Sequence, residues 1–471
     1  MVFSSITFLF IFLPCVLIVY YTINPRFRNL FLTFASLFFY AWGEQKLVML
    51  MLFSIVINYL GGIVIGRYRQ KEKWKLAKYA MLIFVAVNVA LLGYFKYTNF
   101  FIDSINEWGI FRLSSLNEIV LPIGISFFTF QGMSYLIDVY YRRVEAQNNL
   151  VSMALYISMF PQLIAGPIVR YIDVAKQIEA RRRWSGIQFQ DGIRRFITGL
   201  FKKVIIANPM GLVADAVFND VASADGLTLW VGCICYAFQI YFDFSGYSDM
   251  AIGLGKMFGF NYLENFNLPY ISKSVQEFWR RWHISLSTWF KDYLYIPLGG
   301  NRKSVSRTYV NLIIVFFITG LWHGASWNFI VWGLFHGLFL ILERVWLGRI
   351  LVRIPAFFAH LYLLFVVLTG WVFFRAETLI EAIIYLKGMF GGVEGSHAII
   401  SQYITPYFVF VSVLAILLST PLKRILASYL LRFKNSLAPR IFIECVYLFL
   451  LFICLLELAQ SNYNPFIYFR F

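Results

Sequence analysis

The stretch that decides the fold is Gly-Leu-Trp-His-Gly-Ala-Ser-Trp-Asn-Phe-Ile-Val-Trp-Gly-Leu-Phe-His-Gly, residues 320–337. It holds two of the five histidines, His323 and His336, in a segment otherwise as apolar as a membrane span. An ionisable group is costly in hydrocarbon, so by default it marks a functional site. We predict a functional role for His323; the alternative is a packing histidine that hydrogen-bonds a neighbouring helix.

The composition around this stretch is that of a membrane protein. Of 471 residues, 60% are hydrophobic and 14% charged, and the mean hydropathy is +0.69. A soluble protein of this length needs far more polar surface. We expect a single membrane-embedded domain over residues 1–471. The five cysteines lie in apolar runs without metal-ligand spacing, so neither a metal site nor a disulfide framework is expected.

Apolar windows follow one another along the whole chain. A span needs roughly 20 apolar residues, so the shorter windows indicate tilted, paired or re-entrant segments. We predict an all-α polytopic membrane protein with about eleven transmembrane helices plus re-entrant and interfacial helices. The windows lie near residues 6–22, 29–42, 47–66, 79–96, 121–140, 149–168, 196–216, 228–242, 309–320, 326–345, 357–374, 408–420 and 441–459.

The net charge of +17 is explained first by topology. Basic residues gather in short loops between apolar windows, where the positive-inside rule accounts for them without nucleic-acid binding. The Arg26/Arg28 turn and residues 67–78 are basic and the turn at 42–46 between them is not, which predicts an N-terminus on the outer side of the membrane. Residues 170–203 interleave basic and apolar residues, which is typical of amphipathic helices in the cytoplasmic interface.

Four clusters of polar residues interrupt the apolar background. Residues 121–138 predict a broken or closely packed helix, and residues 160–170 predict a re-entrant turn beside a cavity. The third cluster, 241–249, favours equally a network that fixes packing and a cavity lining; it includes Asp243, Ser245 and Tyr247.

The fourth and densest cluster, residues 277–303, is typical of a pocket rim where charge meets apolar surface. Its centre is His283, beside Ser285 and among aromatic side chains. Its basic residues could hold phosphates, although anchoring at the interface is the commoner role for any one of them: Arg280, Arg281, Lys291, Arg302 and Lys303. His323 and His336 are 13 residues apart and point to different sides of a continuous helix, so a shared metal is not expected.

These blocks together resemble the bacterial branch of the membrane-bound O-acyltransferase family, especially its members in alginate and peptidoglycan O-acetylation. The resemblance rests on residues 121–131, 160–170, 241–253, 265–270, 278–295 and 320–337, in the family's order, and extends to the terminal block 464–471. It implies acetyl transfer from cytosolic acetyl-CoA, through a tunnel, to an acceptor on the outer side.

The resemblance also implies site residues and partners. The family's catalytic histidine in Trp-His-Gly falls on His323, and its second position falls on His283. The residues predicted to support them or to line the tunnel are His336, Trp322, Trp282, Asp243, Ser245, Tyr247, Ser285 and Asn328. Acetyl-CoA is expected as a substrate, without a permanently bound cofactor. The chain is expected in a bacterial inner membrane, passing acetyl to an extracytoplasmic partner resembling SGNH hydrolases.

The chemistry independently favours a histidine base. Attack of a hydroxyl on a thioester needs a group that takes the hydroxyl proton, and desolvation keeps a buried histidine neutral and able to accept it. His323 is the predicted base, with His283 as a second donor or thioester-orienting group. The alternatives are a transporter or channel for an anionic solute, and a scaffold of a cell-envelope complex with structural histidines.

Overall fold

The computed structural model describes residues 1–109, 119–164, 166–391, 395–422, 437–461 and 463–467. Their regular structure is helical, apart from one isolated β-bridge between Ala224 and Ser396. The chain divides into two compact units, residues 1–196 with 250–263, and residues 197–249 with 264–471. The all-α polytopic fold expected from the sequence is confirmed; the single domain stays a prediction.

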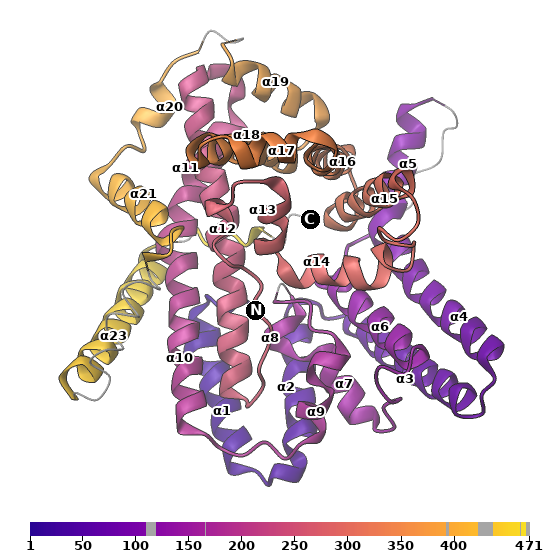
Figure 1. Cartoon of the computed structure of the whole chain (residues 1–471). Helices are drawn as coiled ribbons and strands as arrows, with labels where there is room; N and C mark the ends of the chain where they lie inside the picture. Colours follow the sequence, from indigo (N-terminus) through magenta and orange to yellow (C-terminus); the bar gives the residue numbers. More distant parts are fainter. Residues whose placement is uncertain (110–118, 165, 392–394, 423–436, 462, 468–471) are drawn as a thin grey trace. The chain divides into compact units, whose positions relative to one another are not determined.

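The first unit contains the early helices and the start of a long helix that continues into the second (Figure 1). They are α1 (Leu13–Thr22), α2 (Arg28–Gly43), α3 (Val48–Gln70), α4 (Trp74–Leu92), α5 (Thr98–Glu107), α6 (Ile125–Tyr140), α7 (Leu150–Ser158), α8 (Phe160–Leu163), α9 (Tyr171–Glu179) and the first part of α10 (Gly186–Phe201).

The second unit contains most of the remaining helices, of which α15 and α16 contain most of residues 320–337. They are η4 (Lys202–Ala207), α11 (Asn208–Asn219), most of α12 (Gly226–Met257), α13 (Val275–Arg281), α14 (Ile284–Phe290), α15 (Val305–His323), α16 (Trp327–Leu342), α17 (Gly348–Arg353), α18 (Ala356–Arg375), α19 (Leu379–Met389), α20 (Ala398–Ser401), α21 (Pro406–Leu418) and α23 (Leu437–Gln460).

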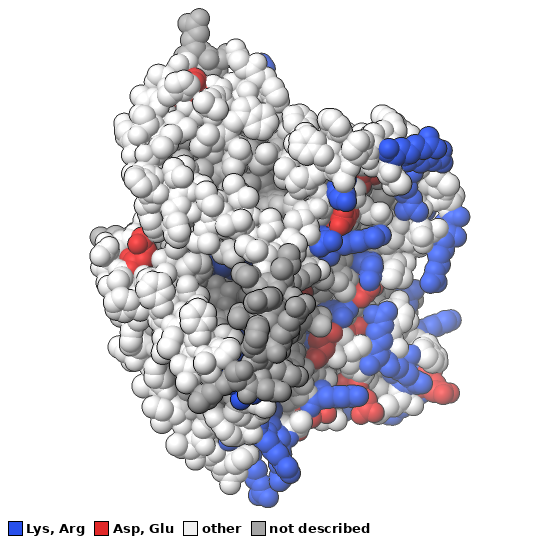
Figure 2. Space-filling view, turned by 60° about the vertical axis from the view of Figure 1, so that its left-hand side comes forward, with Lys and Arg blue, Asp and Glu red and all other residues white. Residues whose placement is uncertain are grey.

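Among the described residues, eight helical runs are long and apolar enough to cross a membrane. Shorter apolar helices at Phe8–Thr22 and Pro406–Leu418 accompany them. Their exposed faces carry large apolar side chains, for example Ile83 on α4 and Phe449 on α23. Figure 2 accordingly shows wide surfaces without charged residues. Such surfaces suit contact with lipid tails.

The structure corrects two details of the predicted elements. Residues 186–219 form one continuous helical run of 34 residues, where the sequence predicted an interfacial helix and then a span from residue 196. His323 and His336 also lie on two helices instead of one, because α15 ends at His323 and α16 begins at Trp327. The separate apolar windows 309–320 and 326–345 agree with two helices, whereas the comparison of the two histidines assumed a continuous one.

Basic segments of the first unit adjoin one another, as the positive-inside pattern requires. Arg28 Nη1 donates to the Arg182 carbonyl at 2.7 Å, so the turn before α2 contacts the residues after α9. Arg142, after α6, likewise donates to the Arg69 carbonyl at the end of α3. Each pair of basic segments therefore ends on the same side of this unit.

Candidate active site

The helices α15 and α16 form a hairpin whose closeness depends on two glycines. A Cβ on Gly320 would lie 2.2 Å from the Phe329 carbonyl oxygen, and one on Gly333 would lie 2.2 Å from that of Phe316. Only glycine lets two helix backbones approach so closely. The crossing is one turn before His323, so the same glycines position this histidine.

His323 is the last residue of α15 and points into an aromatic cavity. Its ring centroid lies 5.0 Å from that of Trp332 and 5.2 Å from that of Phe374. The free volume is about 10 Å³, room for about one water molecule. The lining residues are Ile240, Phe244, Trp282, His323, Trp332, Trp371, Phe374 and Ile467.

His283 lies at the junction of α13 and α14 and is fully buried. Its φ of +44° is in the left-handed region, which costs a residue with a Cβ of the order of 1–3 kcal/mol and is often found at active sites. Its Nδ1 lies 3.1 Å from Asn265 Oδ1. The junction lies outside the candidate spans, and burial lowers the pKa of His283 well below its ordinary value, so the ring is neutral at pH 7.

The fold brings the two predicted catalytic histidines together from segments 40 residues apart. The ring centroids of His283 and His323 are 6.5 Å apart, and Trp322 contacts both rings, at 6.0 and 4.9 Å. Trp282, beside His283 in the sequence, lines the cavity. Two imidazoles at this distance can act on one small substrate group between them.

His336 is placed differently, in the middle of α16 and away from the cavity lining. Its buried ring packs between Trp279 and Trp332, at 5.4 and 5.2 Å, and against Gly370. Neither ring nitrogen has a hydrogen-bond partner among the described residues. Asn328, at the start of α16, donates to the Ala376 carbonyl at 2.7 Å and joins α16 to the end of α18.

The Asp243 cluster forms a buried network beside the cavity. Asp243 pairs with Lys203 at 2.9 Å and accepts the backbone N–H of Ile467 at 2.8 Å. Tyr247 stacks on Phe466 with ring centroids 4.6 Å apart. Through these contacts Asp243 holds residues 466–467 against α12, so that Ile467 reaches the cavity wall.

A second ion pair extends this network, from Lys202 to Asp249 at 2.8 Å. Lys202 Nζ also lies 3.5 Å from Ser245 Oγ. The sequence placed both lysines with the interfacial basic residues, but they pair inside the protein. A Cβ on Gly246 would lie 2.7 Å from the Gly199 carbonyl oxygen, so this glycine allows the close crossing of α10 and α12 that brings the partners together.

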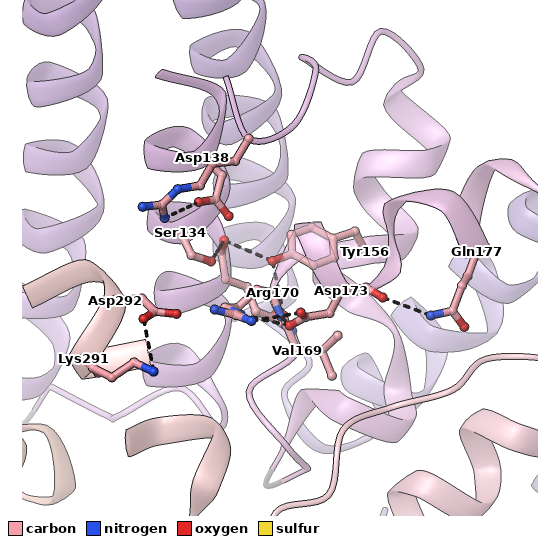
Figure 3. Close-up of polar contacts among 11 residues, drawn as sticks. Ser134, Asp138, Tyr156, Val169, Arg170, Asp173, Gln177, Lys291 and Asp292 are labelled. Carbon is pink, nitrogen blue, oxygen red and sulfur yellow. Dashed lines mark hydrogen bonds and ion pairs between the residues drawn. The ribbon is translucent and has the colours of Figure 1, made fainter. Parts of the chain in front are cut away.

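The residues predicted to hold phosphates lie outside the cavity lining. Arg280, Lys291 and Arg302 are exposed. Arg281 is half-buried and pairs with Glu277 at 2.8 Å, and Lys291 lies 3.6 Å from Asp292 (Figure 3). A role in binding the acyl donor stays a prediction for these four and for Lys303, which is also exposed.

The polar clusters of the first unit hold an irregular backbone in place (Figure 3). The helical structure is interrupted between α7 and α9, at the predicted re-entrant turn. Residue 165 of this turn lies outside the described part. Arg170 makes a two-pronged contact to Asp173, both at 3.0 Å. The Tyr156 hydroxyl donates to the Val169 carbonyl at 3.3 Å, and Gln162 Nε2 to the Tyr156 carbonyl at 2.6 Å. Protein groups thus satisfy this backbone, as burial in a membrane requires.

Sequence reasoning missed three contributors to the site. Lys203 was assigned to the interface, Ile467 lies 144 residues beyond His323, and Asn265 was noted only within a motif. The sequence does contain a signal for Lys203, because a buried acid such as Asp243 needs a positively charged partner. Residues 468–471 of the terminal block lie outside the described part of the chain.

Comparison with known proteins identifies the family. The model of the membrane-bound O-acyltransferase family matches residues 139–380. The probable alginate O-acetylase AlgI of Pseudomonas putida is 41% identical over 502 aligned positions that cover 100% of both chains. Its namesake from Pseudomonas aeruginosa is 46% identical over 400, covering 83% of this chain and 75% of that one. The peptidoglycan O-acetyltransferase of Helicobacter pylori is 38% identical over 434, covering 84% and 81%. The chain therefore belongs to the membrane-bound O-acyltransferase family and is a multi-pass membrane O-acyltransferase.

Proposed function

We propose that the chain transfers acetyl from cytosolic acetyl-CoA, through a tunnel past His323, to an acceptor hydroxyl on the extracytoplasmic side. The observation that carries this proposal is that the ring of His283 lies 6.5 Å from that of His323, which lines the aromatic cavity together with Trp282. The names of the relatives support acetyl as the group and a polysaccharide as the final acceptor. Alginate, peptidoglycan and another exported polysaccharide are the candidates.

In this mechanism the acceptor oxygen attacks the thioester carbonyl carbon while His323 takes the hydroxyl proton. The new C–O ester bond forms, the C–S bond breaks, and the proton passes from His323 to the leaving thiolate to give CoA. His283 Nδ1 lies 3.1 Å from Asn265 Oδ1, which holds the ring in place beside His323. We assign His283 the role of orienting the thioester.

The proposal places the chain in a bacterial inner membrane with its N-terminus outside. Contacts between basic segments on one side of the first unit support a common cytoplasmic side. The immediate acceptor in this scheme is an SGNH-hydrolase-like partner, which passes acetyl to the polysaccharide.

The test supplies radiolabelled acetyl-CoA to the cytoplasmic face of inverted membrane vesicles that contain the full chain and its envelope partners. We expect label in the extracytoplasmic fraction with the parent chain, and a loss of about 100-fold or more with His323→Ala. The matched control is His397→Ala, at an exposed histidine paired with Asp225. His323→Ala at the parent rate would refute the assignment of the base, and unlabelled product with the parent would refute the donor.

A further inference from the structure

Asn265, between α12 and α13, makes more contacts to the site than any role assigned so far explains. Its side chain is 1% exposed. Asn265 Oδ1 lies 3.1 Å from His283 Nδ1, 3.2 Å from the backbone nitrogen of Ser285 and 2.9 Å from Ser285 Oγ. One amide oxygen thus contacts both residues that flank the start of α14.

The Ser285 contact establishes which atom of the amide faces His283. A backbone N–H can only donate, so the atom that it meets must be the amide oxygen. Flipping the amide would set two donors against each other there. The Asn265 Nδ2 donates in the opposite direction, to Ser248 Oγ at 3.1 Å, which agrees with this orientation.

An amide oxygen can only accept, so Nδ1 of His283 must carry the proton in this contact. In a neutral imidazole the other nitrogen, Nε2, then has the lone pair. The backbone keeps this geometry, because Ile284 N donates to the Asn265 carbonyl and Asn267 N to the Arg281 carbonyl, both at 2.9 Å. Asn265 and His283 are therefore fixed as one unit.

We propose that Asn265 is a positioning residue that fixes His283 as the Nδ1–H tautomer and so makes Nε2 the hydrogen-bond acceptor of the active site. The catalytic consequence rests on the proposed function, since it gives His283 the form that can accept a hydrogen bond from an N–H of the acyl donor and so orient the thioester, while the proton of the acceptor hydroxyl goes to His323. The tautomer itself does not depend on that function, and it can be measured without any substrate.

The first experiment measures the tautomer in the full chain. Protein labelled with ¹⁵N-histidine is reconstituted in lipid bilayers, and His283→Gln identifies the resonances of His283 by their loss. We expect a pyrrole-type shift for Nδ1 and a pyridine-type shift for Nε2 in the parent, and a mixture of tautomers in Asn265→Ala. The opposite tautomer in the parent, or an unchanged spectrum in Asn265→Ala, would overturn the proposal.

The second experiment measures acetyl transfer in the vesicle assay. We expect kcat of Asn265→Ala to fall by about 100-fold, because the wrong tautomer removes the acceptor. Asn265→Asp keeps an oxygen for the same three donors, so it should recover at least about tenfold over the alanine variant. Ser248→Ala, which removes only the partner of the opposite end of the amide, should stay within about threefold of the parent.

The variants also separate this inference from a structural role and from the proposed function. If Asn265→Ala does not fold, the parent spectrum and the activities of Asn265→Asp and Ser248→Ala still test whether Asn265 fixes the tautomer of His283. If Asn265→Asp is inactive while Ser248→Ala stays active, the proposal is contradicted. A parent chain that transfers no acetyl from acetyl-CoA refutes the proposed function, while its His283 tautomer continues to test the present inference.

Discussion

The glycine crossing of α15 and α16 allows a sharp test, because its geometry converts directly into a displacement of His323. In Gly320→Ala the new Cβ would lie 2.2 Å from the Phe329 carbonyl oxygen, whereas ordinary contact begins at 3.4 Å. The obstacle is backbone and cannot rotate away, so the helices must separate by about 1 Å. His323 is three residues further on and moves with its helix.

A displacement of about 1 Å at a catalytic group costs about 100-fold in rate. We therefore expect kcat for acetyl transfer to fall by about that factor in Gly320→Ala, with a smaller change in KM. Overpacking should also reduce stability by about 1–3 kcal/mol, visible as earlier thermal inactivation in detergent. Size-exclusion chromatography establishes that the variant is folded before its rate is compared.

Two other glycines supply graded controls. In Gly337→Ala the nearest atom is the Phe316 Cβ at 3.1 Å, so the helices need to separate by only a few tenths of an ångström and a loss of only a few-fold is expected. Gly93 is helical with nothing within 4 Å, so Gly93→Ala should keep the parent rate. Gly320→Ala with a rate like that of Gly93→Ala would refute the claim that this crossing sets the position of His323.

Two further predictions concern charged pairs. Lys203→Met and Asp243→Leu should each destabilise the protein by about 3–5 kcal/mol, because each leaves a buried charge alone. The double variant should recover most of this loss. Equal melting temperatures for the two single variants and the parent would contradict the prediction. Arg170→Lys keeps the charge but loses the two-pronged contact to Asp173, so in protease digestion of the chain in bilayers we expect faster cleavage after α8, and a cleavage pattern like that of the parent would speak against it.

Much of the fold follows from the composition and from the energetic cost of polar groups in a membrane. The spans, the two histidine segments and the break at residues 160–170 were all predicted, because an apolar solvent penalises every polar or irregular exception. The windows 309–320 and 326–345 predicted the two helices α15 and α16, but not the close packing of their backbones at Gly320 and Gly333, because periodicity carries no information on tertiary contacts. Tertiary partners were also beyond reach. A buried acid such as Asp243 implies a basic partner, but nothing local to Lys203 identifies it as that partner.

The positions of the three histidines suggest why two of them suit chemistry and the third suits packing. His323 closes α15 and His283 lies between α13 and α14, so each belongs to a helix end, where the backbone can aim a ring into a cavity. His336 lies in mid-helix, where its ring meets the neighbouring helices and packs among tryptophans. A ring in that setting gains contacts but no access to substrate. Helix ends also bring loops such as that of Asn265, whose polar atoms can fix a tautomer. In this fold, therefore, a histidine at a helix break is the better candidate for catalysis than an equally buried histidine within a span.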